Sequence, residues 1–261
     1  MTKNDQFIQN LSKMNSIMLQ DLKEGKQWTY CNSSGKKGKD FDDTRAKGKY
    51  KINCVDGPQW ALKGGSFGSK VVPNNALSWY GGKGKGPVWL NGSAKANAEK
   101  YFDLIWVNGK YTVNQLVNKR LVCKGDIFVG FNSMNHTCVF YGYNNGNPRS
   151  FDSGHAYCKG SGEGAKMTKW IGSLSSKGSK PICIFRLKDR KHYGLQAGSY
   201  KTDKYKEFQR ELKERFGVDT SVVNIGGEYC VLLGQYGDKD NAEFYQKHFQ
   251  SRGINCLVRE I

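Results

Sequence analysis

The sequence lacks a long hydrophobic run. No apolar stretch approaches the roughly 20 residues that a membrane-spanning helix needs. The first 22 residues mix polar and charged side chains and do not form the apolar centre of a secretory signal. We therefore expect a protein that is not inserted in a membrane and is made in the cytoplasm without a signal peptide. If it acts outside the cell, another factor must release it.

Spacings typical of metal and nucleotide sites are also missing. The eight cysteines include no Cys-x-x-Cys pair and do not cluster with the four histidines, so we predict no metal site. The glycine-rich segment 64–70 does not read as a phosphate-binding loop. Segment 160–165 fits the dinucleotide pattern by letter only, because no strand precedes it and no helix follows. We expect no cofactor.

Acidic residues are scarce relative to basic ones. The chain has 41 Lys and Arg against 23 Asp and Glu, a formal charge of +18. Such a surface attracts polyanions, whether nucleic acid, a membrane face or an anionic cell wall, and charge alone does not choose among them. Asp40, Asp42 and Asp43 fall in a glycine- and lysine-rich stretch, which we interpret as a solvated turn of a loop and not as an acid/base pair.

The hydrophobic pattern of residues 1–188 predicts an α+β domain. Helical spacing occurs in 7–22, and further helices are predicted at 54–63, 94–102 and 113–119. Apolar or alternating runs then predict antiparallel strands at 126–131, 137–143, 149–151 and 182–187, with an Asn/Gly turn at 144–147. Helices followed by a sheet indicate an α+β layout.

An internal repeat begins near residue 190. Tyr193 recurs at Tyr229 and Gly198 at Gly234, each 36 residues on. Each repeat has a strand, a turn, a helix and a second strand, so residues 193–261 predict a separate β-α-β-β-α-β domain of the ferredoxin-like or RNP-like type.

One constellation in the first domain suggests nucleophilic catalysis. Cys54 lies where a polar loop becomes a helical turn containing Pro58, and a helix N-terminus together with a nearby histidine lowers the pKa of a thiol. His136 opens an apolar strand and is the candidate base. Asp152, on the next strand, or His155 could orient it. The backbone N–H of Cys54 is the predicted oxyanion donor. The alternative is a buried core cysteine and a strand histidine with a structural role.

These segments resemble a known family. Residues 53–57 (Asn-Cys-Val-Asp-Gly), 125–127 (Gly-Asp-Ile) and 136–142 (His-Thr-Cys-Val-Phe-Tyr-Gly) are similar to motifs of the NlpC-type, papain-like cysteine peptidases of bacterial cell walls. The resemblance implies a papain-like helix-plus-sheet fold with Cys54 as nucleophile and His136 as base. Tyr30 matches a tyrosine that lines the substrate groove in that family, and we predict that Tyr30 and His155 bind substrate. Asn53 replaces the usual acidic residue and Val55-Asp56 replaces Ser-Gly, which bears on substrate preference.

The repeat domain resembles a SPOR domain. The segments 193–200 and 229–236 are similar to the two halves of its strand motif. SPOR domains bind the glycan strands of peptidoglycan across the sheet face, typically strands stripped of stem peptides. The resemblance therefore makes peptidoglycan the expected partner of this domain. The candidate glycan-binding residues are Gln196, Ser199, Tyr200 and Tyr236, whereas Tyr193 and Tyr229 are interpreted as packing residues.

Both resemblances imply a bacterial cell-wall hydrolase of the kind found in bacteriophage endolysins. The first hypothesis is a cysteine peptidase that cuts an amide bond of the peptidoglycan stem peptide. The second uses the same cysteine and histidine to cut the muramoyl–L-alanine bond as an amidase. A third is a non-enzymatic RNA binder, since RNA-recognition modules share the β-α-β-β-α-β layout, but their aromatic RNP string is absent here. We expect no nucleic-acid partner.

Overall fold

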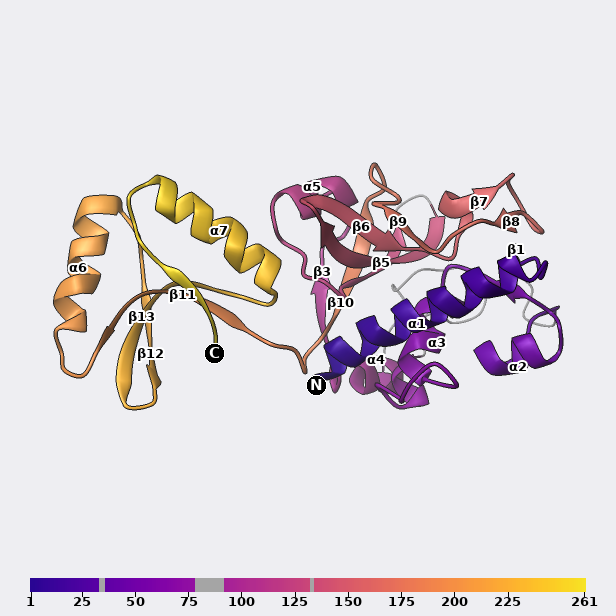
Figure 1. The fold of residues 1–261 in the computed structure, drawn as a ribbon, viewed down its shortest axis with the longest axis horizontal. Helices are drawn as coiled ribbons and strands as arrows, with labels where there is room; N and C mark the ends of the chain where they lie inside the picture. Colours follow the sequence, from indigo (N-terminus) through magenta and orange to yellow (C-terminus); the bar gives the residue numbers. More distant parts are fainter. Residues whose placement is uncertain (33–35, 78–91, 132–133) are drawn as a thin grey trace. The chain divides into compact units, whose positions relative to one another are not determined.

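The computed structural model describes residues 1–32, 36–77, 92–131 and 134–261. The chain divides into two compact units, Met1–Arg190 and Lys191–Ile261 (Figure 1). Within these described ranges, no helix has the length and apolar character needed to cross a membrane.

A six-stranded antiparallel sheet forms the centre of the first unit. Its strands, in spatial order, are β3 (Phe102–Trp106), β10 (Pro181–Leu187), β4 (Ile127–Phe131), β5 (Met134–Asn144), β6 (Asn147–Phe151) and β9 (Ile171–Ser173). A two-residue turn joins β5 to β6, with Asn145 and Gly146 at φ 49° and 77°. Positive φ at both positions suits Asn-Gly and matches the twist of the strands.

Helices cover both faces of this sheet. Helices α1 (Lys3–Lys23) and α3 (Asp56–Lys63) contact each other and pack on the face that presents Val139 and Phe151 (Figure 1). Helix α5 (Val113–Asn118) packs on the opposite face, against Phe128 and Phe140. Neighbouring strand residues such as Val139 and Phe140 thus enter different cores, as the two-residue period of a strand requires.

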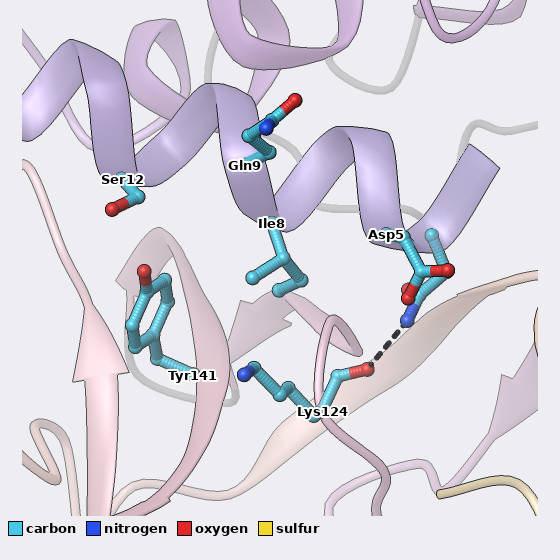
Figure 2. A pocket seen from close by; sticks show the side chains of 7 residues that line it. Asp5, Ile8, Gln9, Ser12, Lys124 and Tyr141 are labelled. Atoms are coloured by element: carbon cyan, nitrogen blue, oxygen red, sulfur yellow. Dashed lines mark hydrogen bonds between the residues drawn. The ribbon is translucent and has the colours of Figure 1, made fainter. Parts of the chain in front are cut away.

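Helix α1 is tied to the rest of the unit by buried amides. A reciprocal capping box between Thr2 and Asp5 starts the helix. The buried Asn10 side chain donates to the carbonyls of Ala61 and Ser69 at 2.7 and 2.9 Å. Near the start of the helix, the Asn4 side chain donates to the Lys124 carbonyl at 3.1 Å, beside a cavity of about 310 Å³ (Figure 2). None of the predicted catalytic residues lines this cavity.

The Gly-Asp motif before β4 fixes the backbone through hydrogen bonds and ion pairs of Asp126. Asp126 is fully buried, and its carboxylate accepts from the Arg186 guanidinium at 2.6 Å and from Arg190 at 3.5 Å. It also accepts from the backbone N–H of Cys123 at 2.8 Å. Gly125 has φ 93°, a left-handed conformation that glycine adopts without steric cost. The motif therefore fixes the entry of the chain into the central sheet.

Most predicted elements of this unit agree with the structure, and two do not. The predicted loop before residue 49 contains helix α2 (Phe41–Ala46), because Asp40 accepts from the Asp43 N–H as an N-cap. The helix predicted at 94–102 is α4 (Gly92–Glu99), which ends early because Phe102 begins β3. The smaller elements are η2 (Asn74–Leu77), η4 (His155–Tyr157) and a second sheet of β2 (Lys51–Ile52), β1 (Thr29–Tyr30), β8 (Lys166–Met167) and β7 (Cys158–Lys159).

The second unit has the predicted β-α-β-β-α-β order. Its elements are β11 (Tyr193–Tyr200), α6 (Tyr205–Phe216), β12 (Ser221–Ile225), β13 (Glu228–Tyr236), α7 (Lys239–Ser251) and β14 (Leu257–Glu260). The sheet order is β12-β13-β11-β14, with all neighbours antiparallel. Leu195, Val231 and Leu233 from the strands pack with Leu212 of α6 and Ala242 of α7 to form its core.

Candidate active site

Cys54 lies in a tightly bonded turn that leads into α3. The Asn53 side chain accepts from the N–H groups of Val55 and Asp56, both at 3.0 Å. In return, the Asp56 carboxylate accepts from the Asn53 N–H at 2.8 Å. This reciprocal arrangement has the pattern of a capping box, closes the turn 53–56 immediately before α3 (Asp56–Lys63), and holds Cys54 in that turn. The Cys54 residue itself is 4% exposed.

Neighbouring elements hold the same turn in place. Lys37 Nζ lies 2.5 Å from the Asp56 carboxylate, and its side chain is only 6% exposed. Burial raises the pKa of Asp56, against the opposing charge of Lys37. Ser153 Oγ donates to the Asn53 carbonyl at 2.7 Å. Gly57 is packed so closely that an added Cβ would lie 2.6 Å from the Phe151 ring and from Ser153 Oγ.

His136, near the start of β5, connects Cys54 to Asp152. Its Nε2 lies 3.1 Å from Asp152 Oδ2, and the residue is 8% exposed. The thiols of Cys54 and Cys138 are neighbours of its ring. Burial acts to lower the pKa of His136, but the charge and the hydrogen bond of Asp152, together with these two thiols, outweigh it and hold that pKa well above its usual value. Since Nε2 is engaged by Asp152, Nδ1 is the nitrogen left for a thiol.

Asp152, and not His155, contacts the His136 ring. Asp152 is fully buried just after β6, and its second oxygen accepts from the Gly154 N–H at 2.7 Å. Gly154 presses against the imidazole, because an added Cβ there would lie 2.7 Å from His136 Cε1. His155 is exposed, with its Nε2 3.0 Å from the Gly162 carbonyl oxygen. Of the two alternatives for the orienting group, the geometry favours Asp152.

Tyr30 and His155 form an aromatic pair next to the nucleophile. Their ring centroids are 4.0 Å apart, and Tyr30 is 8% exposed. The Tyr30 hydroxyl donates to Asn32 Oδ1 at 2.9 Å. Burial raises the pKa of Tyr30 to about 12, with a further contribution from the nearby charge of Cys54. These two residues, both predicted to bind substrate, therefore lie together beside Cys54.

Cys138 adds a second thiol to the site, which the motif search did not single out. It is fully buried, and burial raises its pKa, while its hydrogen bonds with His136 and Ser175 oppose that change. The ligand atoms of His136, Cys138 and Asp152 lie within 4.8 Å of one another, a spacing that a metal ion could bridge. The chemistry fits poorly, since a metal would need the Cys138 thiolate that burial disfavours and would replace the His136–Asp152 hydrogen bond.

The four predicted glycan-binding residues of the second unit do not share a face. Gln196 accepts from the Arg259 guanidinium at 3.0 Å, and Ser199 donates to Glu228 at 2.5 Å, on the face away from the helices. Tyr200 and Tyr236 point the other way. Their rings contact Phe208 of α6 and Tyr245 of α7, at 5.6 and 5.0 Å between centroids.

A β-bulge explains this division. The pairing of β11 with β13 shifts register on both sides of Gln196, so the alternation of side chains changes phase within the strand. Tyr200 then folds over Gly198, where an added Cβ would lie 2.8 Å from the tyrosine ring. Tyr236 covers Gly234 in the same manner, with its hydroxyl 2.6 Å from the equivalent point. The repeated Gly-x-Tyr pattern is thus a packing motif.

The strand face away from the helices also carries Glu228 and Arg259, which were not among the predicted binding residues. Arg259 reaches across from β14 to Gln196 and lies 3.7 Å from Cys230 Sγ, while Glu228 accepts from Ser199. Arg259 could have been selected from the sequence, because it alternates with Val258 in the last strand and so lies on the opposite face from that core residue. Gln196, Ser199, Glu228 and Arg259 therefore form a polar cluster on the strand face opposite the helices.

Comparison with known proteins confirms the resemblance predicted for the second unit. Residues 189–260 match the SPOR domain model, so this segment is a SPOR domain. The chain is also similar to the solution structure of the peptidoglycan binding domain of the B. subtilis cell wall lytic enzyme CwlC. Identity is 24% over 29% of this chain and 96% of that one, with a TM-score of 0.25. The comparison with curated proteins gave no match.

Proposed function

We propose that the protein is a peptidoglycan hydrolase that cleaves an amide bond of the wall with Cys54 as nucleophile. The observation that carries the proposal is that the His136 ring bonds through Nε2 at 3.1 Å to the buried Asp152 and has the Cys54 thiol as a neighbour close enough to act on its pKa. Hydrolysis of an amide by a thiol needs this arrangement of a nucleophile, a base and a carboxylate that orients the base.

In the proposed reaction, the Cys54 sulfur attacks the amide carbonyl carbon while the proton of the thiol resides on His136. The carbonyl π electrons move to oxygen, where the Cys54 N–H is the predicted donor. As the C–N bond breaks, His136 gives its proton to the leaving amine. Water then attacks the thioester with His136 as base, releasing the acid and restoring the thiol. Asp152 holds the imidazole in position throughout and stabilises its charged form.

Peptidoglycan is the proposed substrate because the same chain carries a SPOR domain. We place the cut in the stem peptide, where amide bonds are abundant, and the enzyme is expected to act like a bacteriophage endolysin after release to the wall. The basic charge of +18 favours retention on an anionic surface. The amidase alternative differs only in the bond that is cut, and it is favoured by a SPOR domain that prefers bare glycan strands.

Purified sacculi provide the test. The Cys54→Ala variant should lose activity by about 10³-fold or more, because it removes the sulfur that forms the proposed thioester. Its binding to sacculi should be unchanged, since the SPOR unit is intact. Cys158→Ala is the matched control, a partly buried cysteine outside the triad, and should retain activity.

Mass spectra of the released fragments separate the two cuts. New amino termini on L-alanine would identify an amidase, and new amino termini further along the stem would identify a peptidase. Full lysis of sacculi by Cys54→Ala would refute both.

A further inference from the structure

A charged cavity of about 440 Å³ lies beside the turn that carries Cys54. One wall is a single face of α3, with Asp56, Trp60 and Lys63 at positions i, i+4 and i+7. The other wall is the segment that runs from Lys37 to Lys47. The cavity contains none of the proposed catalytic or substrate-binding residues.

Positive charge exceeds negative charge in this cavity. Four lysines line it against two aspartates, a net formal charge of +2 (four minus two). Lys37 is paired with Asp56, and Lys47 lies 2.9 Å from Asp43. Within the described part of the chain, neither Lys39 nor Lys63 forms an ion pair. The charges of Lys39 and Lys63 act on Asp43 and Asp56 at longer range, so a ligand could contact both ammonium groups without breaking a direct ion pair.

The chemistry of the lining favours a phosphodiester. The cationic side chains are all lysines, which bind phosphate as point charges, whereas planar carboxylates are best recognised by the arginine fork. Trp60 is 3% exposed, so its ring contributes a covered apolar wall and cannot stack on a nucleobase. A phosphate-linked chain without bases fits this combination better than a nucleic acid does.

We propose that the cavity binds the phosphodiester backbone of an anionic, polyol-phosphate wall polymer. The ammonium groups of Lys39 and Lys63 contact the phosphate oxygens, while the Lys37–Asp56 pair forms the buried end of the site. The SPOR domain brings the chain to peptidoglycan, where such a polymer would be encountered. The proposal concerns binding by the first unit and does not depend on the proposed hydrolysis.

The test is titration calorimetry of the full chain with a short synthetic poly(glycerol phosphate). The double variant Lys39→Ala/Lys63→Ala should weaken binding roughly tenfold, since it removes both available charges. The double variant Lys70→Ala/Lys119→Ala removes two exposed charges elsewhere in the same unit and should change the dissociation constant by less than about twofold. The charge-retaining variant Lys39→Arg/Lys63→Arg should bind within a few-fold of wild type.

Three outcomes would overturn the proposal. The first is equal weakening in both alanine variants, which would assign binding to the general charge of the protein. The second is tighter binding of an oligonucleotide of equal charge that depends on Lys39 and Lys63, which would assign the cavity to nucleic acid. The third is no detectable binding by the wild-type chain. Thermal unfolding of each variant checks that the fold is retained.

Discussion

The charge of Asp152 should set the upper pH limit of the proposed activity. Asp152→Asn is nearly isosteric, and its side-chain oxygen can still accept from the Gly154 N–H, as Asp152 does at 2.7 Å. It removes the negative charge 3.1 Å from His136 Nε2 and turns an amide N–H₂ donor toward that nitrogen in place of the carboxylate acceptor. That charge is a main reason why the pKa of His136 lies well above its ordinary value despite burial.

The size of the effect follows from this contact. An opposite charge within hydrogen-bond distance changes a pKa by about 1–3 units, which is about 1.4–4 kcal/mol. Because the folded pKa of His136 is raised, its stabilising contribution is fully present below the unfolded value near ~6.5 and is lost as pH rises through the folded pKa. The variant should therefore lose the most stability at about pH 6, and the deficit should shrink at alkaline pH.

The rate of sacculus lysis as a function of pH measures the same quantity. Leaving-group departure needs protonated His136, so the alkaline limb should move to lower pH by about 1–3 units in Asp152→Asn. Asp103→Asn, an exposed carboxylate of the same unit, should leave the limb unchanged. An unchanged alkaline limb in Asp152→Asn, with the fold intact by urea denaturation, would refute the role given to Asp152.

Two glycine substitutions test the packing around the sites. Gly154→Ala would place a Cβ 2.7 Å from the His136 ring, so activity on sacculi should fall about 100-fold while unfolding free energy falls by only about 1–3 kcal/mol. Gly178→Ala, where no atom lies within 4 Å of the added carbon, should be neutral, and equal effects would contradict the model. Gly198→Ala should destabilise the SPOR unit in urea by about 1–3 kcal/mol because it displaces Tyr200, and an unchanged midpoint would contradict that packing.

Elements with strong periodicity could be predicted from the sequence. Helix α1 was predictable because its buried residues recur at helical spacing, and the β5–β6 hairpin because Asn-Gly fits its turn. Helix α2 was missed because its glycine- and lysine-rich surroundings hid the Asp40 cap. Phe102 was assigned to the preceding helix because one aromatic residue at a helix end fits both the helical and the strand pattern of hydrophobic spacing.

The candidate triad was predictable as residue types, but its supports were not. Cys54, His136 and Asp152 could be chosen because each begins or ends an element. The hydrogen bond from Ser153 to Asn53 joins residues 100 positions apart, so no local sequence pattern could predict it. The same applies to Tyr200 and Tyr236, which were expected on the sheet face of Gln196 and Ser199 but pack against Phe208 and Tyr245, because a bulge changes the alternation of the strand.

Asn53 sets the geometry of the turn that carries Cys54. An acidic residue at this position would place a second carboxylate beside Asp56, whose pKa burial already raises. Asn53 instead accepts two N–H bonds without charge, and Asp56 supplies the carboxylate that Lys37 neutralises. The carboxylate of this turn therefore lies at Asp56, where Lys37 neutralises it. Asn53 and Asp56 act together to hold the turn around Cys54.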